Sequence, residues 1–166
     1  MNLVTYLCVD GDQCPQPTCL QCVCASPDTP IETPDGPRAI ASLHVGDRVY
    51  SVDHGRLVAV PIARVNRAPV RGHHVVHVEI EGGTVLEISG PHPTADGRTF
   101  ADLHAGDHLG GRKIVRVALV PYREDSTYDI LPASDTGTYF AGGVLVGSTL
   151  GGSPAAGDTG AFTASF

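Results

Sequence analysis

The chain has 166 residues, a formal net charge of -7 and only 11 Lys and Arg residues, which form no basic cluster. This charge argues against nucleic acid as the main partner, and no apolar run approaches the roughly 20 residues that a membrane-spanning helix needs. The length suits one domain with tails. Because Gly (20) and Pro (13) are frequent and Trp is absent, the composition predicts an all-β domain with many turns.

Residues 1–23 form a Cys-rich flank that differs from the rest of the chain. It contains Cys8, Cys14, Cys19 and Cys22, and Cys24 follows directly. Two disulfides are the favoured interpretation, because so short a segment has little core of its own. A four-thiolate zinc site and free thiols are the alternatives. The odd number of cysteines leaves one unpaired, and the flank favours an extracellular or cell-surface location.

Short strands are predicted from Cys24 to about Leu150. Three hairpins are expected, around Asp53-His54-Gly55, within residues 73–89 at Glu81-Gly82-Gly83, and within residues 138–146 at Gly142-Gly143. Further strands are expected at 57–65, where Pro61 marks a bulge or an edge, and at 113–120 and 128–131. No segment shows a sustained helical period. Residues 150–166 are rich in Gly, Ser, Ala and Thr and are expected to form a flexible tail.

A short internal repeat divides the predicted strands. Leu43-His44-Val45-Gly46-Asp47 recurs as Leu103-His104-Ala105-Gly106-Asp107, and both copies precede strands. The repeat suggests two related β subdomains about a pseudo-two-fold axis. Asp47 and Asp107 are therefore expected to fix turns rather than to catalyse, and His44 and His104 are expected to be structural.

Three motifs follow one another along the chain. The first is Cys24 followed by Asp28-Thr29, Ile31, Asp35-Gly36 and Leu43–Val49; the second is Ser89-Gly90-Pro91-His92; the third is Tyr128-Asp129-Ile130 with Thr138–Val146. In this order and spacing they resemble the Hint domain, the self-processing module of inteins, bacterial intein-like domains and Hedgehog proteins. The resemblance covers about residues 24–149. It implies an all-β horseshoe of short, curved antiparallel strands with pseudo-two-fold symmetry.

The resemblance also implies a role for four residues. Cys24 would attack the carbonyl of Val23 and turn the scissile Val23–Cys24 peptide bond into a thioester, since a thiolate is a strong nucleophile. His92 would donate a proton to the departing nitrogen. Ser89 would hydrogen-bond the scissile carbonyl or its oxyanion, and Asp129 would act as general base or orient the thiol. The alternatives are structural: a disulfide for Cys24, a surface loop for His92, a strand end for Ser89 and a turn cap for Asp129.

The end of the third motif departs from the family pattern. Splicing members continue with His-Asn and then Cys, Ser or Thr, whereas Gly147-Ser148-Thr149 stands here, and Gly137 replaces a frequent His. We therefore expect N-terminal cleavage or acyl transfer instead of full splicing. The substrate would be the chain's own N-terminal flank, and the acceptor would be water, a small thiol or amine, or Ser148 or Thr149. No cofactor and no metal are expected, and the domain is expected to be a monomer.

Two other hypotheses remain open at this level. One is a catalytically inactive Hint-fold module that serves as an extracellular binding or linker domain, and the other is a zinc knuckle in the N-terminal flank. His73, His74 and His77 share one predicted strand, and exposed positions are favoured over a metal site there.

Overall fold

The computed structural model describes residues 24–151, and these residues form an all-β architecture, as predicted. The predictions for residues 1–23 and for the tail beyond 151 lie outside the described residues. The first sheet has the strand order β11 (Val144–Gly147), β10 (Thr138–Ala141), β1 (Pro30–Ile31) and β2 (Arg38–Ala39). The second is β3 (Arg48–Asp53), β4 (Arg56–Pro69) and β9 (Ser126–Pro132). The third is β6 (Thr84–Ile88), β5 (His74–Ile80), β8 (Arg112–Pro121) and β7 (His108–Leu109).

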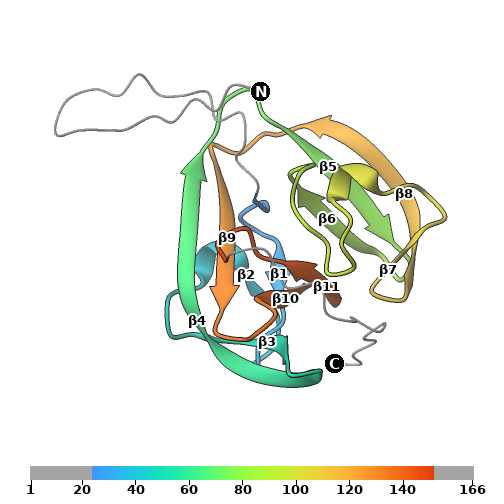
Figure 1. The fold of residues 1–166 in the computed structure, drawn as a ribbon. Coiled ribbons are helices and arrows are strands. Elements are labelled where there is room, and N and C mark those ends of the chain that lie inside the picture. The colour runs from blue at the N-terminus through green and yellow to red at the C-terminus, as the bar shows by residue number, and fades with distance from the viewer. Residues whose placement is uncertain (1–23, 152–166) are drawn as a thin grey trace, which may run out of the picture.

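All strand pairs in these sheets are antiparallel. Figure 1 shows the long pair β4 and β9 on one side of the molecule and the β5–β8 pair on the other, with β1, β10 and β11 between them. Single-turn 3-10 helices, η1 (Ile40–Ser42) and η2 (Phe100–Asp102), are the helical elements of the described part. Within residues 24–151, neither is long and apolar enough to cross a membrane.

The three predicted hairpins are confirmed. β3 turns into β4 at His54 and Gly55, whose φ angles of 48° and 72° are both positive, as a tight two-residue turn requires. β10 turns into β11 at Gly142 and Gly143, and a Cβ on Gly142 would come within 2.6 Å of Thr84 Cγ2. Glycine at that position is therefore demanded by both the backbone and the packing.

The internal repeat folds into two matching turns, which confirms its structural interpretation. Asp47 Oδ2 accepts a hydrogen bond from His44 N at 2.9 Å, and Asp107 Oδ2 accepts one from His104 N at 2.9 Å. The glycine before each Asp then donates to the long strand that follows, at 2.9 Å for β4 and 2.8 Å for β8. Each repeat is preceded by η1 or η2, so the two halves of the domain are built alike.

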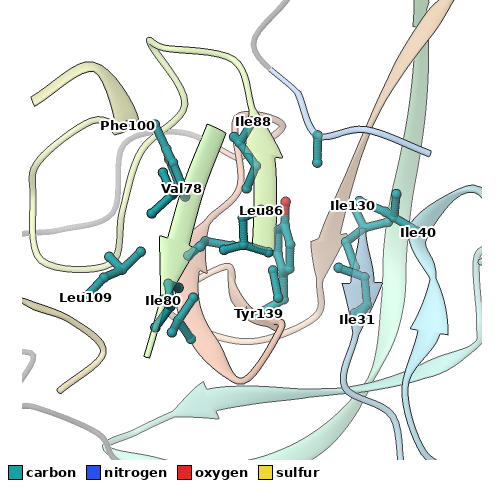
Figure 2. Packing of buried hydrophobic residues seen from close by; sticks show 14 of the residues in the cluster. Ile31, Ile40, Val78, Ile80, Leu86, Ile88, Phe100, Leu109, Ile130 and Tyr139 are labelled. Carbon is teal, nitrogen blue, oxygen red and sulfur yellow. The ribbon is translucent and has the colours of Figure 1, made fainter. Parts of the chain in front are cut away.

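A large hydrophobic core connects the sheets, and Val52, Phe140 and Leu145 form a second, smaller cluster within the described residues. Figure 2 shows Leu86 and Ile88 of β6 facing Tyr139 of β10, with Ile31 and Ile130 close by. Each fully buried side chain of this size contributes roughly 1.5–3 kcal/mol. The ring of Tyr139 belongs to this core, while its hydroxyl extends toward the start of the domain, where the predicted site residues lie.

Candidate active site

Cys24 enters the fold between two sheets. The next residue, Ala25, forms β-bridges to Ile88 of β6 and to Tyr128 of β9, with hydrogen bonds of 2.8 Å and 2.9 Å to the latter. These bridges fix the backbone beside Cys24 from both sides. The Cys24 side chain is only 3% exposed, and its sulfur is a free thiol.

The environment of Cys24 keeps its thiol protonated at neutral pH. Burial and the negative charge of Asp129 raise the pKa of the thiol from its ordinary 9.0 to about 11, while hydrogen bonds with the side chains of Thr127 and Asn66 act in the opposite direction. A thiol with this pKa needs a base before it can attack a carbonyl. Asp129 is the carboxylate whose charge acts on this thiol.

Ser89 forms hydrogen bonds with the backbone of Cys24. Its Oγ accepts a hydrogen bond from Cys24 N at 3.2 Å and donates one to Cys24 O at 2.9 Å, and its own N–H donates to the same carbonyl at 3.0 Å. Cys24 N is the nitrogen of the predicted scissile bond. The contact of Ser89 with the Val23 carbonyl stays a prediction, because Val23 lies outside the described residues.

His92 is fully buried instead of lying in a surface loop. Its ring packs edge-on against Phe100 and Tyr139, with centroid distances of 6.1 Å and 6.5 Å, and its Nε2 lies 3.4 Å from the Tyr139 hydroxyl. His92 N donates to Ser89 O at 3.0 Å, so one tight loop carries both residues of the second motif.

Asp129 is a fully buried carboxylate at the centre of a hydrogen-bond network. Its Oδ1 accepts from Ile130 N at 2.8 Å and from the Tyr139 hydroxyl at 2.9 Å. Its Oδ2 accepts from Thr149 N at 2.7 Å, from Thr149 Oγ1 at 2.6 Å and from Ser148 Oγ at 3.4 Å. Burial and the charge of Asp129 raise the pKa of Tyr139 well above its ordinary value, so the phenol stays a donor to this carboxylate.

The two ends of the described domain therefore meet at one carboxylate. The charge of Asp129 acts on the Cys24 thiol at the first residue, and its carboxylate holds Thr149 close to the last one. The loop of the second motif joins them too, because Ser89 holds Cys24 and Pro93 O accepts a hydrogen bond from Gly147 N at 3.0 Å. All four predicted catalytic residues and both predicted acceptors are thus brought into one region.

Four further residues take part that the sequence patterns did not assign to the site. Tyr139 links His92 to Asp129, and Thr127 and Asn66 contact the thiol. Asn66 stands opposite Asp129 in the β4–β9 ladder, a register that the sequence does not reveal. The fourth is His73, whose Nε2 lies 2.9 Å from Ser89 Oγ.

The prediction that the strand histidines are exposed is wrong for two of the three. His74 is exposed, but His73 and His77 are partly buried. His77 contacts the carboxylates of Glu87 at 3.0 Å and Glu79 at 3.3 Å, whereas His73 turns toward Ser89. The reason is that neighbouring side chains cover both rings: Tyr122 packs against His73, and Glu79 and Glu87 flank His77.

Possible metal ligands in the described range gather in one exposed group, Asp53, His54 and Asp135. Hydrogen bonds within the turns account for these carboxylates, because Asp53 Oδ1 accepts from Asp135 N at 2.7 Å and Asp135 Oδ1 accepts from His54 N at 3.0 Å. The zinc hypothesis for Cys8, Cys14, Cys19 and Cys22 lies outside the described residues.

These features define a Hint fold in which Cys24 and the residues after the closing strand lie near a shared carboxylate, and comparison with solved structures agrees. The chain is similar to a DnaB intein from Synechocystis sp. PCC 6803, with a TM-score of 0.65, 14% identity and coverage of 76% of this chain and 99% of that one. It is similar to a bacterial intein-like domain from Clostridium thermocellum, with a TM-score of 0.64, 21% identity and coverage of 75% and 96%. For the gp41-1 intein the TM-score is 0.61 at 18% identity, with coverage of 76% and 99%.

No family model matches the chain, and no curated protein matches it. At these low identities the likeness shows the fold, and the function has to be argued from the site.

Proposed function

We propose that this chain is a self-processing domain that converts the Val23–Cys24 peptide bond into a thioester by an N-to-S acyl shift. The observation that carries the proposal is the placement of Cys24: its nitrogen is held by Ser89, and its buried thiol lies within reach of the charge of Asp129. The substrate is the chain's own N-terminal flank. The fold shared with inteins and an intein-like domain also supports a self-processing function.

The proposed step exchanges one bond and includes two proton transfers, one from the thiol and one to the nitrogen. Cys24 Sγ forms a bond to the carbonyl carbon of Val23, the bond from that carbon to Cys24 N breaks, and the nitrogen gains a proton to become an amine. Asp129 takes the proton of the thiol, which is needed because the thiol is protonated at neutral pH. His92 is the donor to the nitrogen that the family resemblance implies, and Tyr139 connects its ring to Asp129.

The thioester then has two kinds of acceptor. Water or a small thiol or amine would release residues 1–23, and Thr149 would form a branched ester within the chain. Thr149 is exposed and its Oγ1 donates to Asp129 at 2.6 Å, so Asp129 can activate this hydroxyl once the proton taken from the thiol has left the carboxylate. Ser148 stands where splicing members have the cyclising Asn, and a serine has no amide nitrogen to attack the backbone. Cleavage or acyl transfer is therefore the proposed outcome, and not splicing.

Incubation of the purified chain with dithiothreitol tests the proposal directly. We expect release of a fragment that ends at Val23, because a thiol exchanges rapidly with a thioester but does not attack an amide. Intact mass spectrometry with and without the thiol measures the release. An intact chain after prolonged thiol treatment would contradict the proposal and point to an inactive Hint-fold module.

Substitution of the two acceptor candidates tests the branched product. Thr149→Ala removes Oγ1 but keeps the backbone N–H that bonds Asp129, so we expect it to eliminate an alkali-labile branched species while thiol-dependent release continues. Ser148→Ala is the matched control, since its hydroxyl makes only a 3.4 Å contact with Asp129, and it should retain the branch. Gel mobility before and after mild alkali separates the products, and equal branching in both variants would exclude Thr149 as the acceptor.

A further inference from the structure

His73 lies immediately before β5, beside the loop that carries Ser89. Its Nε2 is 2.9 Å from Ser89 Oγ, and its ring meets Tyr122 edge-on at a centroid distance of 5.7 Å. The backbone is fixed as well, because Tyr122 N donates to His73 O at 2.9 Å. The imidazole is thus held against the hydroxyl that contacts the scissile nitrogen.

The hydrogen bonds of Ser89 decide which nitrogen of His73 carries a proton. Ser89 Oγ accepts from Cys24 N at 3.2 Å and donates its single hydrogen to Cys24 O at 2.9 Å. A serine hydroxyl has one hydrogen and two acceptor lone pairs, so the remaining lone pair receives the Nε2–H of His73. In the opposite tautomer the hydroxyl hydrogen would point to His73, and Ser89 Oγ and Cys24 O would face each other without a hydrogen between them.

We propose that His73 is a positioning residue for the acyl shift, which passes a proton through Ser89 to the nitrogen of Cys24. This inference rests on the proposed self-processing function. As Cys24 Sγ bonds to the Val23 carbonyl carbon and the carbon–nitrogen bond breaks, the electron pair stays on the nitrogen. The nitrogen takes the hydroxyl hydrogen of Ser89, and Ser89 Oγ takes the Nε2 hydrogen of the His73 imidazolium. The proton of the thiol goes to Asp129, so atoms and charges balance.

The partial exposure of His73 suits this role. A fully buried imidazole such as His92 has no direct exchange with solvent, whereas His73 reaches solvent and can take up its proton there before the step. His73 therefore gives the site a second proton donor that works beside His92.

The groups around His73 make its imidazolium a good acid. Burial, and then the neighbouring His74, lower the pKa of His73 below its ordinary 6.5. Tyr122 packs on it as a neutral phenol, because burial raises the pKa of that hydroxyl. Three acidic groups lie on this side of the domain, and their negative charges also raise the pKa of Tyr122. They are Glu124, Asp28 and Glu87.

The rate of thiol-dependent release as a function of pH tests the relay. His73→Gln supplies an amide N–H for Ser89 but cannot donate a proton, so we expect its rate to fall about 10- to 100-fold below wild type near pH 6. This deficit should shrink as pH rises, because fewer wild-type chains then carry the imidazolium. His44→Ala, which removes an exposed histidine of the internal repeat, is the matched control and should follow wild type. A deficit that is constant with pH, or none at all, would overturn the relay.

A second measurement does not depend on activity. In the Cys24→Ala chain, which cannot be processed, nitrogen NMR of the histidine rings should show His73 in the Nε2–H tautomer. Ser89→Ala in the same background should expose that hydrogen to faster solvent exchange. An Nδ1–H tautomer would overturn the relay even if the chain cleaves. Absence of release from the wild-type chain would instead contradict the proposed function. The tautomer of His73 could still be measured in that case.

Discussion

Cys24→Ala is expected to abolish the thiol-dependent release of residues 1–23. The sulfur is the only atom proposed to bond with the Val23 carbonyl, and a methyl group cannot replace it. Loss of a nucleophile in other self-activated sites lowers rates by several orders of magnitude, so we expect a decrease of at least about 1,000-fold. Intact mass spectrometry after dithiothreitol treatment measures the effect, with the wild-type chain processed in parallel.

The fold of this variant can be checked independently. Alanine fills most of the space of the buried side chain, and we expect a loss of only about 1–2 kcal/mol in unfolding free energy. Cys24→Ser is the second variant: its hydroxyl can attack, but more weakly than the thiol, so slow release is expected. Release from folded Cys24→Ala at the wild-type rate would mean that the scissile bond is broken by another group.

Asp129→Asn is expected to make the Cys24 thiol more acidic and yet to slow the cleavage reaction. Removal of the negative charge should lower the pKa of the thiol from about 11 toward its ordinary 9.0, because the carboxylate is the second cause of the rise after burial. Cleavage should nevertheless slow by about 100- to 10,000-fold near neutral pH, since an amide cannot accept the thiol proton. The midpoint of Cys24 alkylation against pH and the release rate measure the two effects in one variant.

The same variant carries a cost in stability. Both oxygens of Asp129 accept from donors, among them the Tyr139 hydroxyl and Thr149 N. An Asn would turn its NH₂ toward one set of these donors, at a cost of roughly 1–3 kcal/mol. Asp107→Asn is the control, because that carboxylate fixes a turn in the repeat and contacts His104 N and Arg98, away from the site residues of the described domain. If Asp129→Asn left the release rate unchanged, Asp129 would not be the base.

The wild-type pH profile follows from the same pKa. The thiolate fraction of Cys24 rises tenfold with each pH unit until about pH 11, so alkylation of the folded chain should lag behind that of the unfolded chain throughout the neutral range. The raised pKa also means that the folded chain disfavours the thiolate. This contribution to stability is complete below pH 9.0 and is lost as pH rises toward about 11.

Local patterns in the sequence were sufficient for much of the fold. The glycine-containing turns and the alternation of apolar residues predicted the β3–β4, β5–β6 and β10–β11 hairpins, because a tight turn and its flanking strands depend on adjacent residues. The repeated turns at Asp47 and Asp107 were predicted for the same reason. Pro61 was expected to mark a bulge, and the register shift of β4 lies just after it, between Ile62 and Arg64.

The motif spacing also identified Cys24, Ser89, His92 and Asp129 as candidates, and the structure places them in one region. Their roles remain proposals that the experiments above test.

What the sequence determined by itself was therefore the local part: the strands, the turns and the residue types that can do acyl chemistry. Only the tertiary structure decided which distant groups act on them. Asn66 reaches the Cys24 thiol through the register of the β4–β9 pair, and His73 reaches Ser89 through the pairing of β5 with β6. The physical reason is that hydrogen bonds and charge effects act over a few ångströms in space, and strand pairing brings together residues that have no fixed separation along the chain.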